Sequence, residues 1–163
     1  MTKQFNIDEI FELAEQIERN GAKFYRSAAD RMDKAEQRQM LGELALMEDE
    51  HERTFAAMRS QLARDMQRES VYEVDDQAKQ YLWAWVENAV FDMSVDPLAV
   101  LETANISEIL RTAIGREKES IVFYEGLKGG IDSDADRAKV DAIIGEEMKH
   151  IGLLMRQLRA LQG

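Results

Sequence analysis

The sequence predicts an all-α fold, a four-helix bundle built from two antiparallel helical hairpins that are joined by a long crossover. Three observations lead to this prediction. Apolar residues recur at steps of three and four over four long segments, the spacing of one helix face. The chain also repeats itself without a gap at a shift of 99 residues, so that Glu18 matches Glu117 and Tyr25 matches Tyr124. The chain has 163 residues and a single proline, and this length predicts one domain that spans residues 1–163.

The first hairpin spans residues 6–63. One helix is expected from about residue 6 to 30 and another from about 33 to 63, because apolar side chains return every three or four residues through both segments. Only a few residues separate the two helices, and a turn this short makes them antiparallel. Asp33 is expected to cap the start of the second helix.

The crossover, residues 64–103, is too long for a turn. It begins polar and becomes apolar and aromatic over residues 81–93, where we expect a short helix that ends near Pro97. Trp83 and Trp85 are expected to cap the bundle or to form a dimer contact rather than to bind a ligand. A homodimer is expected, with the hairpins kept in one chain or swapped between two, because the length of the crossover permits either. We expect this crossover to place the first helix parallel to the third.

The second hairpin spans residues 104–160, with helices from about 104 to 128 and from about 134 to 160. Gly129 and Gly130 are expected to end the first of these helices, and the residues up to Ser133 provide capping groups for the next. The turn is again short, so these two helices are also predicted to be antiparallel.

Composition argues against several kinds of site and partner. The chain has no cysteine, which rules out disulfides, thiolate zinc sites, iron–sulfur clusters and cysteine nucleophiles, and which fits a reducing, cytoplasmic location. The net charge of −11 argues against a nucleic-acid partner and favours attraction of cations. The sequence has no apolar run of about 18 residues and no N-terminal signal core, so we expect neither a membrane partner nor export.

Polar residues interrupt the apolar stripe of each helix at matching depths, and they include both histidines of the chain. The six interruptions are Glu18, Glu48, His51, Glu117, Glu147 and His150. Burying unpaired carboxylates costs several kcal/mol each, and no lysine or arginine lies on the stripes to neutralise them. Two divalent cations would balance four carboxylates and two neutral imidazoles. A glutamate from each of two helices and Glu-x-x-His from each of the others is the pattern of a dinuclear carboxylate site.

The alternative is that the four faces are solvated and that the assumed helix phase is wrong. Four apolar side chains would then face water: Leu44, Phe55, Val140 and Leu154. Two charged residues beside the ligands in sequence, Arg116 and Glu146, lie off the stripes and are expected at the surface, where Glu146 could also guide cations inward.

Tyr25 and Tyr124 lie seven residues after the glutamates of the first and third stripes, on the same helix faces. Two interpretations stay open for them. Each is either a redox-active phenol or a hydrogen-bond donor to a ligand carboxylate, or it is an ordinary core tyrosine. Gly21 and Ser120 also face the predicted metals, where they either leave room for oxygen or peroxide or simply allow close helix packing.

These motifs resemble the rubrerythrin-type branch of the ferritin-like superfamily. The resemblance rests on Ala14-x-x-x-Glu18 with Phe24-Tyr25-x-x-Ala28-Ala29, on Glu48-x-x-His51, on Glu117 with Phe123-Tyr124, and on Glu147-x-x-His150. It covers the four helices but not the middle of the crossover. It implies a ferritin-like fold and a di-iron centre with two bridging carboxylates (Glu48 and Glu147), two terminal carboxylates (Glu18 and Glu117) and one histidine on each metal (His51 and His150).

Two features depart from rubrerythrins. The chain has no cysteine-rich rubredoxin module to deliver electrons, so an external electron-donor protein is expected. Ser120 stands where rubrerythrins carry an additional glutamate, which removes the carboxylate toward which a metal would shift. The site is therefore expected to be more symmetric than that of rubrerythrin.

The leading hypothesis is a non-haem di-iron oxidoreductase that reduces hydrogen peroxide or dioxygen, with the six residues as its catalytic metal site. Iron or manganese suits oxygen and imidazole ligands, and zinc could also bind. Two hypotheses of other classes stay open. One is an iron-binding ferroxidase for iron storage or delivery, and the other is a structural or interaction module in which metal is a folding staple.

Overall fold

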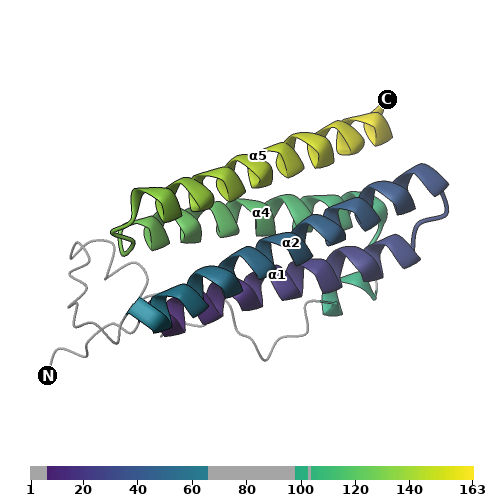
Figure 1. Cartoon of the computed structure of the whole chain (residues 1–163). Coiled ribbons are helices and arrows are strands. Elements are labelled where there is room, and N and C mark those ends of the chain that lie inside the picture. Colours follow the sequence, from purple (N-terminus) through teal and green to yellow (C-terminus); the bar gives the residue numbers. More distant parts are fainter. Residues whose placement is uncertain (1–6, 66–97, 103) are drawn as a thin grey trace, which may run out of the picture.

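The computed structural model describes residues 7–65, 98–102 and 104–163. These residues form four long helices and one 3₁₀ turn: α1 (Ile7–Asp30), α2 (Ala35–Asp65), η1 (Ala99–Leu101), α4 (Ile106–Lys128) and α5 (Asp134–Gln162) (Figure 1). The all-α fold is confirmed, and each helix begins and ends within two residues of its predicted bounds. The short helix predicted within residues 81–93 and both tryptophans lie outside the described residues. None of the helices described is long and apolar enough to cross a membrane.

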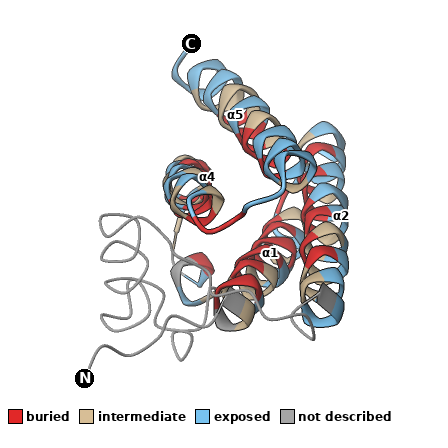
Figure 2. Ribbon diagram, turned by 60° about the vertical axis from the view of Figure 1, so that its left-hand side comes forward, coloured by how far each residue is buried: buried red, intermediate tan, exposed pale blue. Residues whose placement is uncertain are grey.

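The four helices form two hairpins that face each other. Helix α1 packs along α2 and α4 packs along α5, while α1 also contacts α4 and α2 contacts α5. Figure 2 shows that the buried residues of all four helices are turned toward the space that the helices share. Helix α5 begins with its predicted cap, because the Ser133 hydroxyl accepts a hydrogen bond from the Asp136 backbone N–H. The cap predicted for α2 was wrong by one residue: α2 begins after Lys34, not after Asp33.

Helices α1 and α4 run antiparallel, so the predicted parallel orientation is wrong. Phe11, near the start of α1, shares a cluster with Leu127 from the end of α4, whereas Ala28, near the end of α1, shares another with Ile109 from the start of α4. Figure 1 shows the same arrangement, in which α4 begins at the end of the bundle where α2 begins. A crossover of this length can span the roughly 46 Å of a 31-residue helix, so its length alone did not decide the direction.

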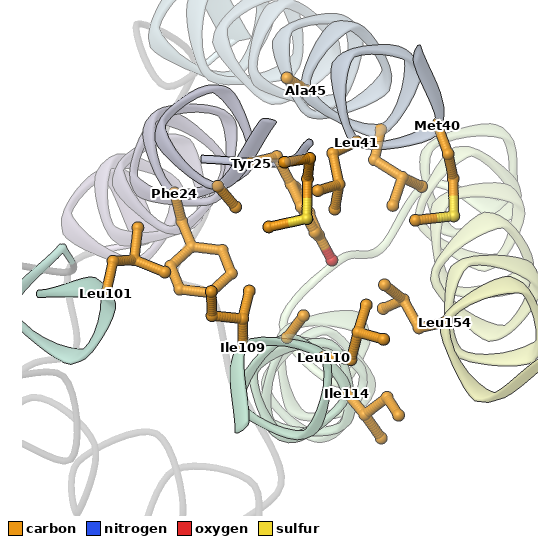
Figure 3. Packing of buried hydrophobic residues seen from close by; sticks show 14 residues of the cluster. Phe24, Tyr25, Met40, Leu41, Ala45, Leu101, Ile109, Leu110, Ile114 and Leu154 are labelled. Atoms are coloured by element: carbon orange, nitrogen blue, oxygen red, sulfur yellow. The ribbon is translucent and has the colours of Figure 1, made fainter. Parts of the chain in front are cut away.

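Two apolar clusters fill the bundle, one toward each end. The first contains Phe11, Phe55 and Val140, and the second contains Leu44 and Leu154. Figure 3 shows side chains of the second cluster converging from all four helices and from η1. Full burial of a side chain of this size contributes about 1.5–3 kcal/mol. The four residues whose exposure the solvated-face alternative requires are at most 1% exposed, so the predicted helix phase is confirmed and that alternative is wrong.

Candidate metal centre

The six polar residues of the stripes meet in one buried space between the two apolar clusters. Helices α1 and α4 each contribute one glutamate, and α2 and α5 each contribute a glutamate and a histidine one turn apart. No more than 5% of any of these residues is exposed: Glu18, Glu48, His51, Glu117, Glu147 and His150. The sequence pattern therefore located every member of this cluster, which we call the polar centre.

The polar centre contains two groups of four converging atoms that could each hold a metal ion. In each group, one carboxylate oxygen or imidazole nitrogen per residue lies within 4.8 Å of the other three. The first group comprises Glu18, Glu48, His51 and Glu147, and the second comprises Glu48, Glu117, Glu147 and His150. Because Glu48 and Glu147 belong to both groups, the geometry matches that of two metal positions bridged by two carboxylates.

Several atoms of the polar centre are buried without a hydrogen-bond partner. They are Glu18 Oε2, Glu48 Oε1, His51 Nδ1, both carboxylate oxygens of Glu147, and His150 Nδ1. The two Nδ1 atoms lie 2.8–3.3 Å from carboxylate oxygens, but these contacts lack the alignment of hydrogen bonds. An unpaired buried polar group costs about 1–3 kcal/mol, and folded proteins contain few of them. Converging lone pairs without donors fit cations, so the residues present suit a pair of metal ions.

Most carboxylates of the polar centre resist ionisation when no metal is bound. Burial raises the pKa of Glu18 and Glu48, with the nearby carboxylates adding to it. Burial and the charges of Glu48 and Glu117 raise the pKa of Glu147 to about 8. Glu117 is the exception: burial raises its pKa too, but its contacts with Glu147 and His150 outweigh burial and lower the pKa below 4.5. Protons therefore take the place of cations in the metal-free centre.

The same carboxylates also raise the pKa of the two histidines, although burial acts on a histidine in the opposite direction from a glutamate. Burial lowers the pKa of His51, but Glu147 and Glu18 outweigh it and raise the pKa to about 12. Burial likewise lowers the pKa of His150, and contacts with Glu117 and Glu147 raise it to about 12. Both imidazoles are thus protonated at neutral pH in the metal-free protein. A metal must displace these protons, because a ligating nitrogen needs its lone pair.

Two tyrosines cross between α1 and α4 to the polar centre. The Tyr25 hydroxyl donates to Glu117 Oε1, and the Tyr124 hydroxyl donates to Glu18 Oε1. Burial and the neighbouring carboxylates raise the pKa of both hydroxyls well above 10, so each hydroxyl keeps the proton that it donates. The structure thus shows the hydrogen bond from each tyrosine to a carboxylate of the centre, which is one of the roles open from the sequence.

A small cavity reaches the polar centre between α1 and α4. Its walls are Ile17, Gly21, Tyr25, Glu48, Arg116, Glu117 and Ser120, and about 10 Å³ of it is open to the centre of a water molecule. That is room for about one water. Gly21 permits the close approach of Glu48, because a Cβ at this position would lie only 2.6 Å from Glu48 Oε2. The predicted small residues therefore do face the centre, and they border the space left beside it.

Arg116 lines this cavity, whereas the sequence predicted a surface charge at this position. Its guanidinium lies over the Phe24 ring, 5.1 Å from the ring centroid. Burial lowers the pKa of Arg116. One signal in the sequence could have identified this residue: the repeat pairs Arg116 with the apolar Ile17, and Arg116 lies four residues before the inward-facing Ser120, on the same helix face.

Each histidine turns its other ring nitrogen away from the polar centre, toward a different partner. His51 Nε2 lies 2.7 Å from Glu146 Oε2, and His150 Nε2 lies 3.0 Å from Met47 Sδ. The Glu146 side chain is 47% exposed, so it is partly solvated, as predicted, but it also contacts His51 directly. Neither contact was predicted from the sequence, because each joins a residue of α2 to a residue of α5, and helix periodicity does not show which residues of two helices lie side by side.

Comparison with known proteins bears on the fold. A crystal structure from Thermotoga maritima, described as a ferritin-like diiron-carboxylate protein, is similar to this chain, with a TM-score of 0.67 and 23% sequence identity over 98% of both chains. Neither a protein-family model nor a curated protein matches the sequence. The structural likeness confirms the ferritin-like fold, whereas membership of the rubrerythrin-type branch stays a prediction.

Proposed function

We propose that the chain is a non-haem di-iron oxidoreductase that reduces hydrogen peroxide or dioxygen with electrons from an external donor protein. The observation that carries the proposal is the polar centre, whose unpaired buried atoms converge on two positions that share two carboxylates. Two divalent cations would balance its four carboxylates when both imidazoles are neutral. The likeness to a protein described as diiron-carboxylate supports iron as the metal.

The proposed ligand set follows from the two groups of atoms. Two residues would bridge the metals (Glu48 and Glu147), two would bind as terminal carboxylates (Glu18 and Glu117), and each metal would take one imidazole nitrogen (His51 and His150). Oxygen and imidazole ligands suit Fe²⁺ or Mn²⁺, and Zn²⁺ can occupy the same atoms. Two Fe²⁺ ions bound here would supply the two electrons that reduction of an O–O bond takes up.

The surrounding side chains would position the ligands and admit the oxidant. The hydroxyls of Tyr25 and Tyr124 fix the orientation of the terminal carboxylates, because each donates a hydrogen bond to one of them. The cavity beside Gly21 and Ser120 offers a small molecule a place next to Glu48. The apolar clusters on both sides exclude bulk water. Reduction of hydrogen peroxide to two water molecules then consumes two electrons and two protons.

Anaerobic oxidation kinetics test the proposal. The iron-loaded protein is reduced under argon and mixed with hydrogen peroxide, and oxidation of the iron is followed by absorbance. We expect Glu48→Ala to slow this oxidation strongly, because it removes a carboxylate shared by both metal positions. Glu50→Ala, an exposed glutamate of the same helix, is the matched control and should react like the wild type. Oxidation that is equally fast in Glu48→Ala would rule out this role for the polar centre.

The acidic composition favours a second candidate, a ferroxidase that binds and oxidises iron for storage or delivery. A net charge of −11 attracts Fe²⁺ to the surface. Storage requires an assembly of many subunits around a cavity. Light scattering on the iron-loaded protein separates the two functions: a large shell would support storage, and a monomer or dimer would support the oxidoreductase.

A further inference from the structure

We infer that the two metal positions of the polar centre are unequal, and that the residue pair Glu146 and Met47 sets the difference. The position that contains His51 holds its metal more tightly than the position that contains His150. This inference rests on the proposed dinuclear site, and it concerns how the chain's own residues divide that site into a strong and a weak half.

The internal repeat shows where the surroundings of the two metal positions differ. The two pairs of terminal glutamate and bonded tyrosine follow the repeat, as do both Glu-x-x-His motifs. Met47 and Glu146 also occupy equivalent positions, each directly before the glutamate of its motif. Each reaches the histidine of the other hairpin, at 3.0 Å and 2.7 Å respectively. The positions are therefore equivalent in geometry, but the chemical groups that occupy them differ.

Glu146 prepares His51 to bind a metal. A carboxylate oxygen only accepts hydrogen bonds, so His51 Nε2 must carry the proton of this contact. In the neutral ring, Nδ1 then keeps its lone pair, and Nδ1 is the atom that faces Glu18 and Glu147. A carboxylate on the outer nitrogen also fixes the ring orientation and makes the inner nitrogen a stronger donor.

Met47 gives His150 a weaker version of the same support. A thioether sulfur is uncharged and a poor acceptor, so it stabilises the N–H of His150 Nε2 less than a carboxylate would. His150 Nδ1 faces the centre as His51 Nδ1 does, 3.2–3.3 Å from three carboxylates. The two imidazoles thus occupy equivalent places but differ in the partner of the outer nitrogen, and the metal bound through His150 is expected to be the weaker one.

The two halves of the repeat also differ at a second place beside the polar centre, so the test must change only Met47 or Glu146. Arg116 stands where the first half has Ile17, and both line the cavity on the α1–α4 side of the centre. A positive charge near Glu117 would also weaken the second metal position. Exchanging residues on the α2–α5 side leaves Arg116 unchanged, so any equalisation of the two positions can be assigned to the histidine partners.

The test loads the metal-free protein anaerobically with one and then two equivalents of ⁵⁷Fe²⁺ and records Mössbauer spectra. We expect two quadrupole doublets in the wild type, one of which fills first, with dissociation constants that differ by roughly 10- to 100-fold. In Met47→Glu, both histidines face a carboxylate, so the difference between the two dissociation constants should shrink, and the inequality that remains belongs to Arg116. Met148→Glu makes the same change of charge at an exposed site on α5 and should retain the wild-type pattern.

The reverse exchange keeps the inference testable if Met47→Glu does not fold. Glu146→Met should weaken the tighter position alone, by roughly 10- to 100-fold, and bring the two affinities together. The inference is overturned if the wild type fills both positions equally, or if neither exchange changes the inequality, and both results leave the dinuclear site intact. Failure of the wild type to bind two iron ions would instead overturn the proposed function as well.

Discussion

Removing the metals should make the stability of this protein fall as the pH rises above neutrality. Folding without metal raises the pKa of Glu147 from 4.5 to about 8 and that of His51 and His150 from 6.5 to about 12. Between about pH 6.5 and 8, the folded metal-free chain therefore binds more protons than the unfolded chain. Stability then decreases with pH, because deprotonation favours the state that holds fewer protons.

The magnitude follows from the number of extra protons. Each one lowers the free energy of unfolding by about 1.4 kcal/mol per pH unit. If only one extra proton is counted, as a lower bound for the three groups, a rise from pH 6.5 to 8 costs about 2 kcal/mol. For a domain of this size, that lowers Tm by roughly 4–8 °C. The metal-loaded protein should show no such decrease over the same interval, because its ligands are already deprotonated in the folded state.

Thermal unfolding followed by circular dichroism measures both slopes on chelated and on metal-loaded samples. Glu147→Gln is the matched comparison, since it removes the group whose pKa lies inside the interval, and its metal-free form should lose less stability between pH 6.5 and 8. A metal-free wild type whose Tm stays constant or rises from pH 6.5 to 8 would refute the reasoning, because the centre would then hold no extra protons.

Two further perturbations probe the geometry of the centre. Gly21→Ala places a Cβ 2.6 Å from an oxygen of Glu48, so it should reduce the bound iron, which elemental analysis measures. Gly42→Ala is the control, because its Cβ meets no neighbouring atom within 4 Å. It should bind iron normally and gain about 0.5–1 kcal/mol of helix stability. Equal iron contents in the two variants would contradict the close approach. Tyr124→Phe removes the hydrogen bond to Glu18, the terminal carboxylate of α1, and should weaken iron binding roughly tenfold or more in a competition titration with a chelator. An unchanged affinity would show that this hydrogen bond does not support metal binding.

The sequence predicted the members of the polar centre because their position depends on helix periodicity alone. A glutamate or histidine on an apolar stripe must enter the core once the helix packs, and the repeat shows that four such stripes match. The direction of α4 relative to α1 does not follow from periodicity, and a crossover of this length permits both directions. Contacts such as Met47 with His150 were missed for a related reason, because they depend on where α2 and α5 lie side by side.

The division of the polar centre between the two hairpins has a consequence for how the centre assembles. Neither hairpin holds a complete metal position: the first group of atoms takes one carboxylate from α5, and the second takes one from α2. Two identical hairpins related by a twofold axis would furnish the same set of atoms, but only at concentrations at which they associate. Joining both hairpins in one polypeptide makes their encounter intramolecular, so that assembly of the centre no longer depends on protein concentration.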